Sequence, residues 1–274
     1  MAVFGTMSRI LLLCLLLRCS AGVSTERQPW LGEPYELVWR TAAIYQGYAS
    51  LASGSSLKHY PSHDGFLQVS LIGSLPEFAL EMEAVGACTR RQKGDFDHFS
   101  ITGRYIWQDD IAGDPLSVTT GVSLSYACPL AVKDVSAFHH GWGELEAFLS
   151  LGQERVQGAL WRSRWWGLLG LGLAEQGSPW LRAHLSYEKR LGEQHEVGVF
   201  AEALSGLGRH RLHVVHFQGY GAIQHHSIDI GIRYAYEVAY FGKIGAEYVY
   251  RVYAKNFPVH AQVFLLRILY PFGL

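Results

Sequence analysis

The chain has 274 residues, of which 49% are hydrophobic, 13% aromatic and 17% charged. An ordinary soluble domain carries about 25% charged residues, so the composition excludes a disordered chain and indicates much buried or lipid-facing surface. The formal net charge is -1, from 23 basic and 24 acidic residues. Without a basic excess to hold a phosphate backbone, we expect no nucleic-acid partner.

The first predicted element is an export signal over residues 1–21. Arg9 precedes the apolar run Ile10–Leu17, and small residues follow. The run is too short for a transmembrane helix, which needs about 20 residues. We therefore predict a signal peptide that is cleaved after Ala21 or Gly22.

The rest of the chain repeats short segments in which apolar and polar residues alternate. In the clearest of them, residues 227–241, isoleucine and tyrosine share one face, whereas Asp229, Arg233 and Glu237 lie on the other. Successive side chains of a strand point to opposite faces, so each segment predicts a strand with one apolar face. Thirteen such segments can be counted, at residues 35–49, 65–73, 76–88, 96–108, 115–128, 142–152, 158–174, 179–190, 195–206, 211–223, 227–240, 243–254 and 258–271.

Repeated alternation of this kind is typical of outer-membrane barrels, which in bacterial single chains have an even number of strands. One of the thirteen segments is therefore not a strand, or one hides a further turn. We predict an all-β fold, a transmembrane antiparallel up-and-down β-barrel of about 12 strands over residues 35–274, with 14 strands as the alternative. A periplasmic lead-in over residues 22–34 precedes it, and residues 50–64 and 129–141 are predicted as loops on one side.

A water-soluble exported β-sandwich is the competing fold, because alternation alone does not say which face is inside. The export signal, the C-terminal strand and the aromatic residues near strand ends favour a barrel in the outer membrane of a Gram-negative-type cell. The aromatic residues expected in interfacial girdles are Trp107, Trp142, Trp161, Trp165, Trp166, Trp180, Tyr253 and Tyr270. The expected partners are then membrane lipid and the barrel insertion machinery.

Several short motifs are spread over nearly the whole mature chain: Pro29–Gly32, Gly103–Trp107, Asp109–Asp110, Gly113–Pro115, Phe138–Gly141, Gly177–Trp180, Phe217–Gly221, His225–Gly231, Asn256–Pro258 and Tyr270–Leu274. With these motifs the chain resembles an uncharacterised family of chlamydial-type outer-membrane proteins. More broadly it resembles porin-like Gram-negative outer-membrane barrels, from which it departs by ending in Leu274 instead of an aromatic residue. The resemblance implies location and architecture, and no activity.

Charged residues collect on the face that is not apolar, which in a barrel points into the lumen. The candidate lumen-facing charges are Arg40, Glu81, Glu83, Arg104, Glu144, Glu146, Arg162, Arg164, Arg182, Glu188, Glu196, Glu202, Asp229, Arg233, Glu237, Glu247 and Arg251. One interpretation is a polar pore whose charges select small solutes. In the other, the charges pair with each other and fill the lumen of a structural envelope component. Both stay open at this point.

No metal site or cofactor is expected. The pairs His139–His140 and His225–His226 are predicted in solvent-exposed loops, and the chain has no Cys-x-x-Cys or His-Glu-x-x-His pattern. Cys88 and Cys128 are predicted at one rim of the barrel, where a disulfide is permitted but not implied.

A barrel enzyme that acts on lipid, similar to a phospholipase, is the alternative function. It needs a serine and a histidine brought together near the outer interface, and no spacing in the sequence identifies such a pair. Asp109–Asp110 fits the acidic pair of a barrel protease in residue type, but we predict it in a turn on the periplasmic side. No catalytic residue is therefore predicted.

Overall fold

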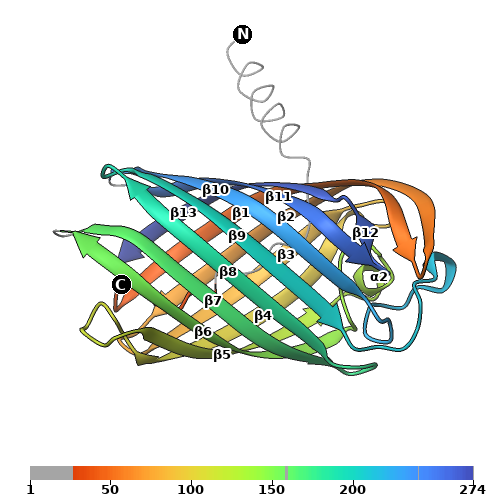
Figure 1. The fold of residues 1–274 in the computed structure, drawn as a ribbon, viewed down its shortest axis with the longest axis horizontal. Helices are drawn as coiled ribbons and strands as arrows, with labels where there is room; N and C mark the ends of the chain where they lie inside the picture. Colours follow the sequence, from red (N-terminus) through yellow and green to blue (C-terminus); the bar gives the residue numbers. More distant parts are fainter. Residues whose placement is uncertain (1–26, 158–159, 240, 274) are drawn as a thin grey trace, which may run out of the picture.

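The computed structural model describes residues 27–157, 160–239 and 241–273. Within them, twelve long strands form one closed antiparallel barrel (Figure 1). They are β1 (Glu36–Ser53), β2 (Ser56–Ser74), β3 (Phe78–Cys88), β4 (Lys93–Gln108), β5 (Ser117–Ala127), β6 (Gly143–Gln157), β7 (Leu160–Ala174), β8 (Trp180–Leu191), β9 (His195–Gly206), β10 (His226–Val238), β11 (Gly242–Lys255) and β13 (Gln262–Gly273). Short elements complete the fold: α2 (Pro129–Val132), a 3-10 helix η1 (Val214–His216) and the two-residue strand β12 (Pro258–Val259).

Each long strand pairs with its neighbour in sequence, and the barrel closes where β1 pairs with β13. That closing register runs from Glu36 opposite Gly273 to Gly47 opposite Gln262. The predicted 12-stranded barrel is confirmed, and the 14-stranded alternative and the two-sheet sandwich are wrong. The extra predicted strand at 211–223 is a loop that contains η1. Its apolar residues Leu212, Phe217 and Tyr220 are buried against other loops instead of lying in the wall.

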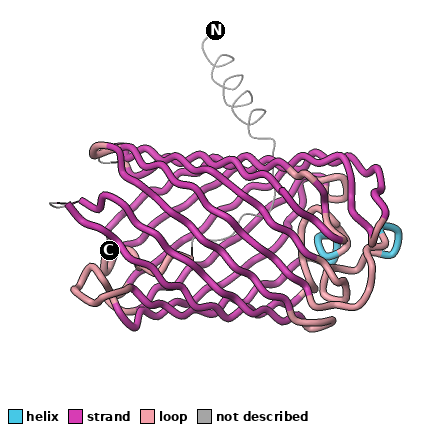
Figure 2. The backbone as a smooth tube through the Cα atoms, viewed as in Figure 1, coloured by secondary structure: helices cyan, strands magenta, loops and turns pink. Residues whose placement is uncertain are grey.

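The two ends of the barrel differ (Figure 2). The turn end carries the start of β1, the end of β13 and short connections, whereas the loop end carries α2, η1 and β12. The predicted loop at 50–64 is wrong, because β1 and β2 stay paired up to Ser53 opposite Ser56 and form one long hairpin. The predicted loop at 129–141 holds α2. The predicted signal peptide lies outside the described residues.

The outer wall is apolar all round the barrel. Large apolar side chains of every long strand are exposed, among them Leu169, Leu185 and Leu266, at 68%, 61% and 63% of their full exposure. Such a continuous exposed apolar surface is typical of a wall that faces lipid. In the described part of the chain, no helix is long and apolar enough to cross a membrane.

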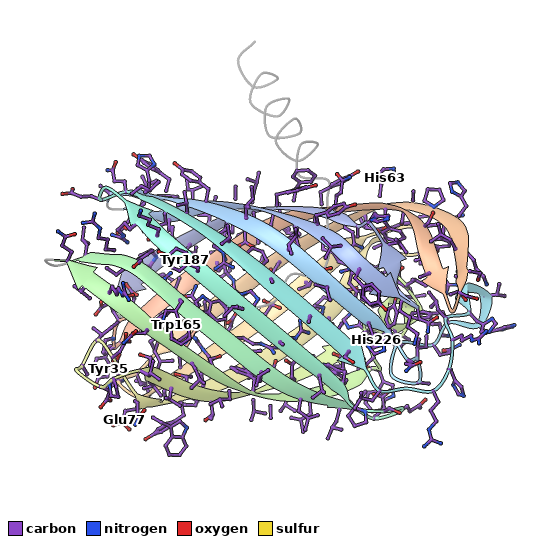
Figure 3. The ribbon with its side chains drawn as sticks, viewed as in Figure 1. Tyr35, His63, Glu77, Trp165, Tyr187 and His226 are labelled. Atoms are coloured by element: carbon purple, nitrogen blue, oxygen red, sulfur yellow. The ribbon has the colours of Figure 1, made fainter. Side chains whose placement is uncertain are left out.

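The predicted aromatic girdles are right only in part. Trp107, Trp142, Trp165, Tyr253 and Tyr270 are exposed on the outside, and Trp165 can be followed in Figure 3. Trp166 and Trp180, however, are buried inside the barrel. They occupy inward positions of β7 and β8, and a side chain that points into the barrel cannot reach the interface between membrane and water.

Two inward glycines make room for large rings on the adjacent strand. A Cβ atom added at Gly172 would lie 1.9 Å from Cε2 of Trp180, and one at Gly121 would lie 2.2 Å from Cζ of Phe148. Both rings therefore lie flat over the neighbouring backbone. This arrangement keeps bulky aromatic side chains inside a narrow barrel without displacing the wall.

Candidate functional site: the barrel interior

The loop end is covered by a plug, which we define as the apolar cluster of Tyr48, Leu51, Val135, Leu212, Phe217, Tyr220, Ile223, Phe257 and Ala261. Its members come from β1 and from the loops 128–142, 207–225 and 256–261. Polar groups at its edges are satisfied: the Tyr220 hydroxyl donates to the carbonyl oxygen of Val135 at 2.9 Å, and the Tyr48 hydroxyl pairs with Ser136 Oγ at 2.7 Å. The three loops are thereby held as one packed unit.

The described part of the predicted lead-in enters the barrel. The carbonyl oxygen of Arg27 accepts a hydrogen bond from Ser150 Oγ at 2.6 Å, and Trp30 Nε1 donates to Asp110 Oδ1 at 2.8 Å. Arg27 also pairs with Glu146. Trp30 packs on Phe148, Trp166 and Leu168. The segment from Arg27 to Leu31, called here the N-terminal segment, thus lines the inner wall near the turn end.

The predicted lumen charges fall into three groups. Those that are buried are Arg40, Glu81, Glu83, Arg104, Glu146, Glu188, Glu196, Glu247 and Arg251. Those that are half-buried are Glu144, Arg164, Arg182, Glu202, Asp229, Arg233 and Glu237. Arg162 alone is exposed; it is the extra residue of a β-bulge opposite Arg155 and Val156, and its position facing the lumen stays a prediction.

Most of these charges are paired with a charge on the adjacent strand or on the next strand beyond it. Arg40 contacts Glu83 at 3.1 Å and also pairs with Glu81. Arg182 lies 3.2 Å from Glu146 and 2.5 Å from Glu202.

Further along the wall, one acid joins two bases. Glu188 lies 2.6 Å from Arg164 and 2.9 Å from Arg233. Arg251 holds Asp229 through two hydrogen bonds of 2.7 Å each. The charged side chains of the interior are therefore largely paired with each other, as the filled-lumen interpretation expected. They nevertheless leave open space inside the barrel.

Two cavities occupy that space. A central cavity of about 210 Å³ lies beneath the plug and is lined mainly by charged residues and histidines. A second cavity of about 540 Å³ lies toward the turn end, between Gln28 and the inner faces of β8 to β11. Arg233 and Arg267 line both cavities. These two arginines therefore lie between the two spaces.

Histidines that were predicted in solvent instead lie inside the loop end. His139, His140 and His225 are buried, at 5%, 4% and 0% exposure. His140 stacks on Trp180 with ring centroids 3.7 Å apart. Burial, followed by the nearby His140, lowers the pKa of His225 to about 3. The prediction that these histidines are exposed to solvent is wrong, because the loops at this end of the barrel pack them into a local core.

His139 binds two acids. Its Nε2 lies 2.9 Å from Asp97 Oδ2, and its Nδ1 lies 3.8 Å from Glu144 Oε1. Burial acts to lower the pKa of His139, but Asp97 and then Glu144 outweigh it and raise that pKa to about 10. The loop 128–142 is thus attached to the wall through charged contacts.

Several interior residues escaped the sequence analysis. They are Arg27, Asp97, His98, His184, Arg190, Lys243 and Arg267, all of which line a cavity or bind a residue that does. Arg267 had a usable signal, because it continues the inward series of Val263 and Leu265 along β13. Arg27 had none, since its place in the lumen depends on the path of the N-terminal segment.

Other predictions concern the two ends. Cys88 and Cys128 lie at the loop end and are free thiols, with Cys88 exposed. Asp109 and Asp110 lie in a turn, as predicted, which joins β4 and β5 at the turn end; that this end is periplasmic stays a prediction. Asp109 caps this turn, accepting a hydrogen bond from the backbone N–H of Ile111 at 3.0 Å.

No family model and no curated protein match the chain. Solved structures do. An outer membrane channel from Pseudomonas putida F1 superimposes with a TM-score of 0.65 at 10% identity, covering 92% of this chain and 100% of that one. The NanC porin gives 0.57 at 10% identity, covering 86% and 100%. The KdgM porin in complex with disordered oligogalacturonate gives 0.52 at 11% identity, covering 85% and 99%.

These likenesses concern the fold. The chain is a 12-stranded antiparallel closed barrel that matches outer-membrane channel structures. The resemblance of its motifs to a chlamydial-type family stays a prediction.

Proposed function

We propose that this protein is an outer-membrane channel that lets small polar solutes pass, after export by the signal peptide predicted at residues 1–21. The observation that carries the proposal is the pair of interior cavities of about 210 and 540 Å³, which are separated by side chains that include Arg233 and Arg267. Charged walls of this kind are what a pore uses to select solutes. Its likeness to solved channels supports the same function.

The passage is narrow, because the plug covers one end and the N-terminal segment lies against the wall near the other. Its solutes are therefore small, and displacement of the plug or of the N-terminal segment widens the passage. The KdgM structure with oligogalacturonate offers a precedent in which a barrel of similar architecture is in complex with a carbohydrate. We propose small anionic or neutral polar solutes as the cargo.

The preference for anions follows from the turn-end cavity. Among the described residues, five basic side chains line it against three acidic ones: Arg164, Arg190, Arg233, Lys243 and Arg267 against Glu188, Glu196 and Glu237. The positive excess lowers the energy of an anion in this cavity relative to a cation. Replacing Lys243 with glutamate removes this excess, so the reversal potential in a salt gradient should shift toward cation preference.

Conductance in planar bilayers tests the channel. The mature protein should give small single-channel steps. The double variant Arg27→Ala/Trp30→Gly, which frees the N-terminal segment from Glu146 and Asp110, should give larger ones. Trp39→Gly is the matched control, because Trp39 is exposed on the outer wall at the turn end.

If the protein is instead a structural envelope component with a filled lumen, no current should pass. If neither the natural chain nor the double variant conducts at any voltage, while both remain folded barrels in the same bilayers, the channel proposal is wrong. Folding is checked by heat-modifiable migration in detergent gels.

One observation favours lipid hydrolysis as a second candidate. Ser205 Oγ lies 2.9 Å from Nδ1 of His226 near the loop end, where Figure 3 labels His226. Ser205 pairs with the outward Leu181, so the serine and histidine share the lipid-facing side. A histidine in this position can take the proton of an attacking serine hydroxyl. Release of fatty acid from phospholipid vesicles, abolished by Ser205→Ala, would establish this activity, and its absence in the natural chain would exclude it.

A further inference from the structure

A cluster of histidines and acids joins the loop 128–142 to the barrel wall. Asp97 and His98 are on β4, and His139 is in the loop. Asp97 Oδ2 lies 2.8 Å from Nδ1 of His98 and 2.9 Å from Nε2 of His139. One ligand atom from each of these three residues lies within 4.8 Å of the others. Three potential metal ligands from two separate segments therefore converge on one point.

A second layer of carboxylates surrounds this point. The other ring nitrogen of His98, Nε2, lies 3.6 Å from Glu83 Oε1. The other ring nitrogen of His139, Nδ1, lies 3.8 Å from Glu144 Oε1. Histidines that bind a metal generally donate their second N–H to a carboxylate or carbonyl, which orients the ring and increases its basicity. At both histidines the cluster places a carboxylate beside the second ring nitrogen, at 3.6 and 3.8 Å, from where a small movement completes such a hydrogen bond.

The site has a route for an ion. Asp97 is buried at 1% exposure, but His98, His139 and both outer glutamates line the central cavity. An ion bound by three protein groups keeps a fourth position for water, and the cavity can supply that water. Two imidazoles and one carboxylate suit zinc, whereas calcium and magnesium prefer sites made of oxygen ligands.

We propose that Asp97, His98 and His139 form a binding site for a divalent ion of the zinc class. The ion replaces the protons that now lie between the carboxylate and the two rings, so binding releases protons and weakens as the pH falls. Because His139 belongs to the loop 128–142 and the other two ligands to β4, the ion fastens one loop of the plug to the wall.

Zinc titration of the purified, refolded full barrel tests the site. The protein is first treated with chelator and dialysed, and Zn²⁺ is then added in a calorimeter at pH 7.5. We expect one tight equivalent per chain. Asp97→Asn and His139→Gln should each abolish that equivalent, and Glu144→Gln should weaken it by about 10- to 100-fold through its effect on His139.

Controls separate the site from adventitious binding. The double variant His59→Gln/His260→Gln removes two exposed histidines far from the cluster in sequence and should bind as the natural chain does. Cobalt substitution should give the intense visible absorption of a four-coordinate ion in the natural chain and in this control only. Each variant is compared as a folded, heat-modifiable barrel.

Two outcomes would overturn the proposal. One is a natural chain that binds no zinc at micromolar concentration. The other is an Asp97→Asn barrel that remains folded and binds as tightly as the natural chain. Neither outcome depends on conductance, so a failure of the zinc site and a failure of the channel are distinguished.

Discussion

Replacing Gly172 with alanine tests whether the ring of Trp180 is held as tightly as the structure implies. The added Cβ atom would lie 1.9, 2.1 and 2.5 Å from Cε2, Cζ2 and Nε1 of Trp180. An ordinary van der Waals contact begins at 3.4 Å, so the ring must retreat by about 1.5 Å. Trp180 is 1% exposed and stacks on His140 at 3.7 Å, so its retreat also displaces His140.

Overpacking of this kind costs about 1–3 kcal/mol, and we expect a value near the upper end because the backbone and His140 both confine the ring. The free energy of unfolding is measured by denaturant titration of the barrel in lipid vesicles. In a double-mutant cycle, Trp180→Leu should remove most of the penalty of Gly172→Ala, which gives a coupling of at least about 1 kcal/mol.

Gly167→Ala is the matched control on the same strand. Its Cβ atom would face outward, 3.4 Å from the carbonyl oxygen of His184 and 3.7 Å from Cδ1 of Leu185. Both variants reduce the entropy of the unfolded chain equally, so that effect cancels in the comparison. If Gly172→Ala unfolds at the same denaturant concentration as Gly167→Ala, the packing argument is wrong.

Three further predictions concern charge, pH and orientation. Arg40→Met removes the cation from the buried Glu81 and Glu83, and should lower the free energy of unfolding by about 3–5 kcal/mol in denaturant titrations; an unchanged midpoint would contradict the pairing. The low pKa of His225, about 3, means that only the unfolded chain takes up a proton below about pH 6.5. Stability from this group is therefore full above pH 6.5 and falls by about 2 kcal/mol at pH 5, a loss that His225→Gln should reduce in the same titration. We expect the loop end to face the cell exterior. Cys88, which is exposed there, should then react with a membrane-impermeant maleimide on whole cells, with Cys88→Ser as the unlabelled control. Labelling only after lysis would show that the loop end faces the periplasm.

The sequence was sufficient for the wall of the barrel. Along β10, Ile228, Ile230 and Ile232 point outward and alternate with Asp229 and Gly231, as the pattern predicted. Each strand carries its own alternation, because one face meets lipid along its whole length and the other does not. The outward and inward faces of the strands therefore follow from local patterns, whereas the number twelve also needed the rule that such barrels have an even number of strands.

The sequence was not sufficient for what lies inside the wall. The segment 211–223 was predicted as a strand, yet its Leu212, Phe217 and Tyr220 are loop residues that pack with Phe257 and Leu51 in the plug. Which loops converge depends on the closure of the whole barrel, and that is not encoded in any single segment. The cluster of Asp97, His98 and His139 was missed for the same reason. Its first two residues are on β4, whereas His139 comes from the loop 128–142.

The composition of the plug also sets an order of assembly. Its residues range from Tyr48 on the first strand to Ala261 just before the last. Their packing therefore requires the complete circle of strands, whereas each hairpin of the wall can pair with its neighbour as it arrives. Contacts between such distant residues form late, because the entropy of closing the intervening chain must be overcome first. We therefore expect the plug to pack late in folding, after β13 has paired with β1 and closed the barrel.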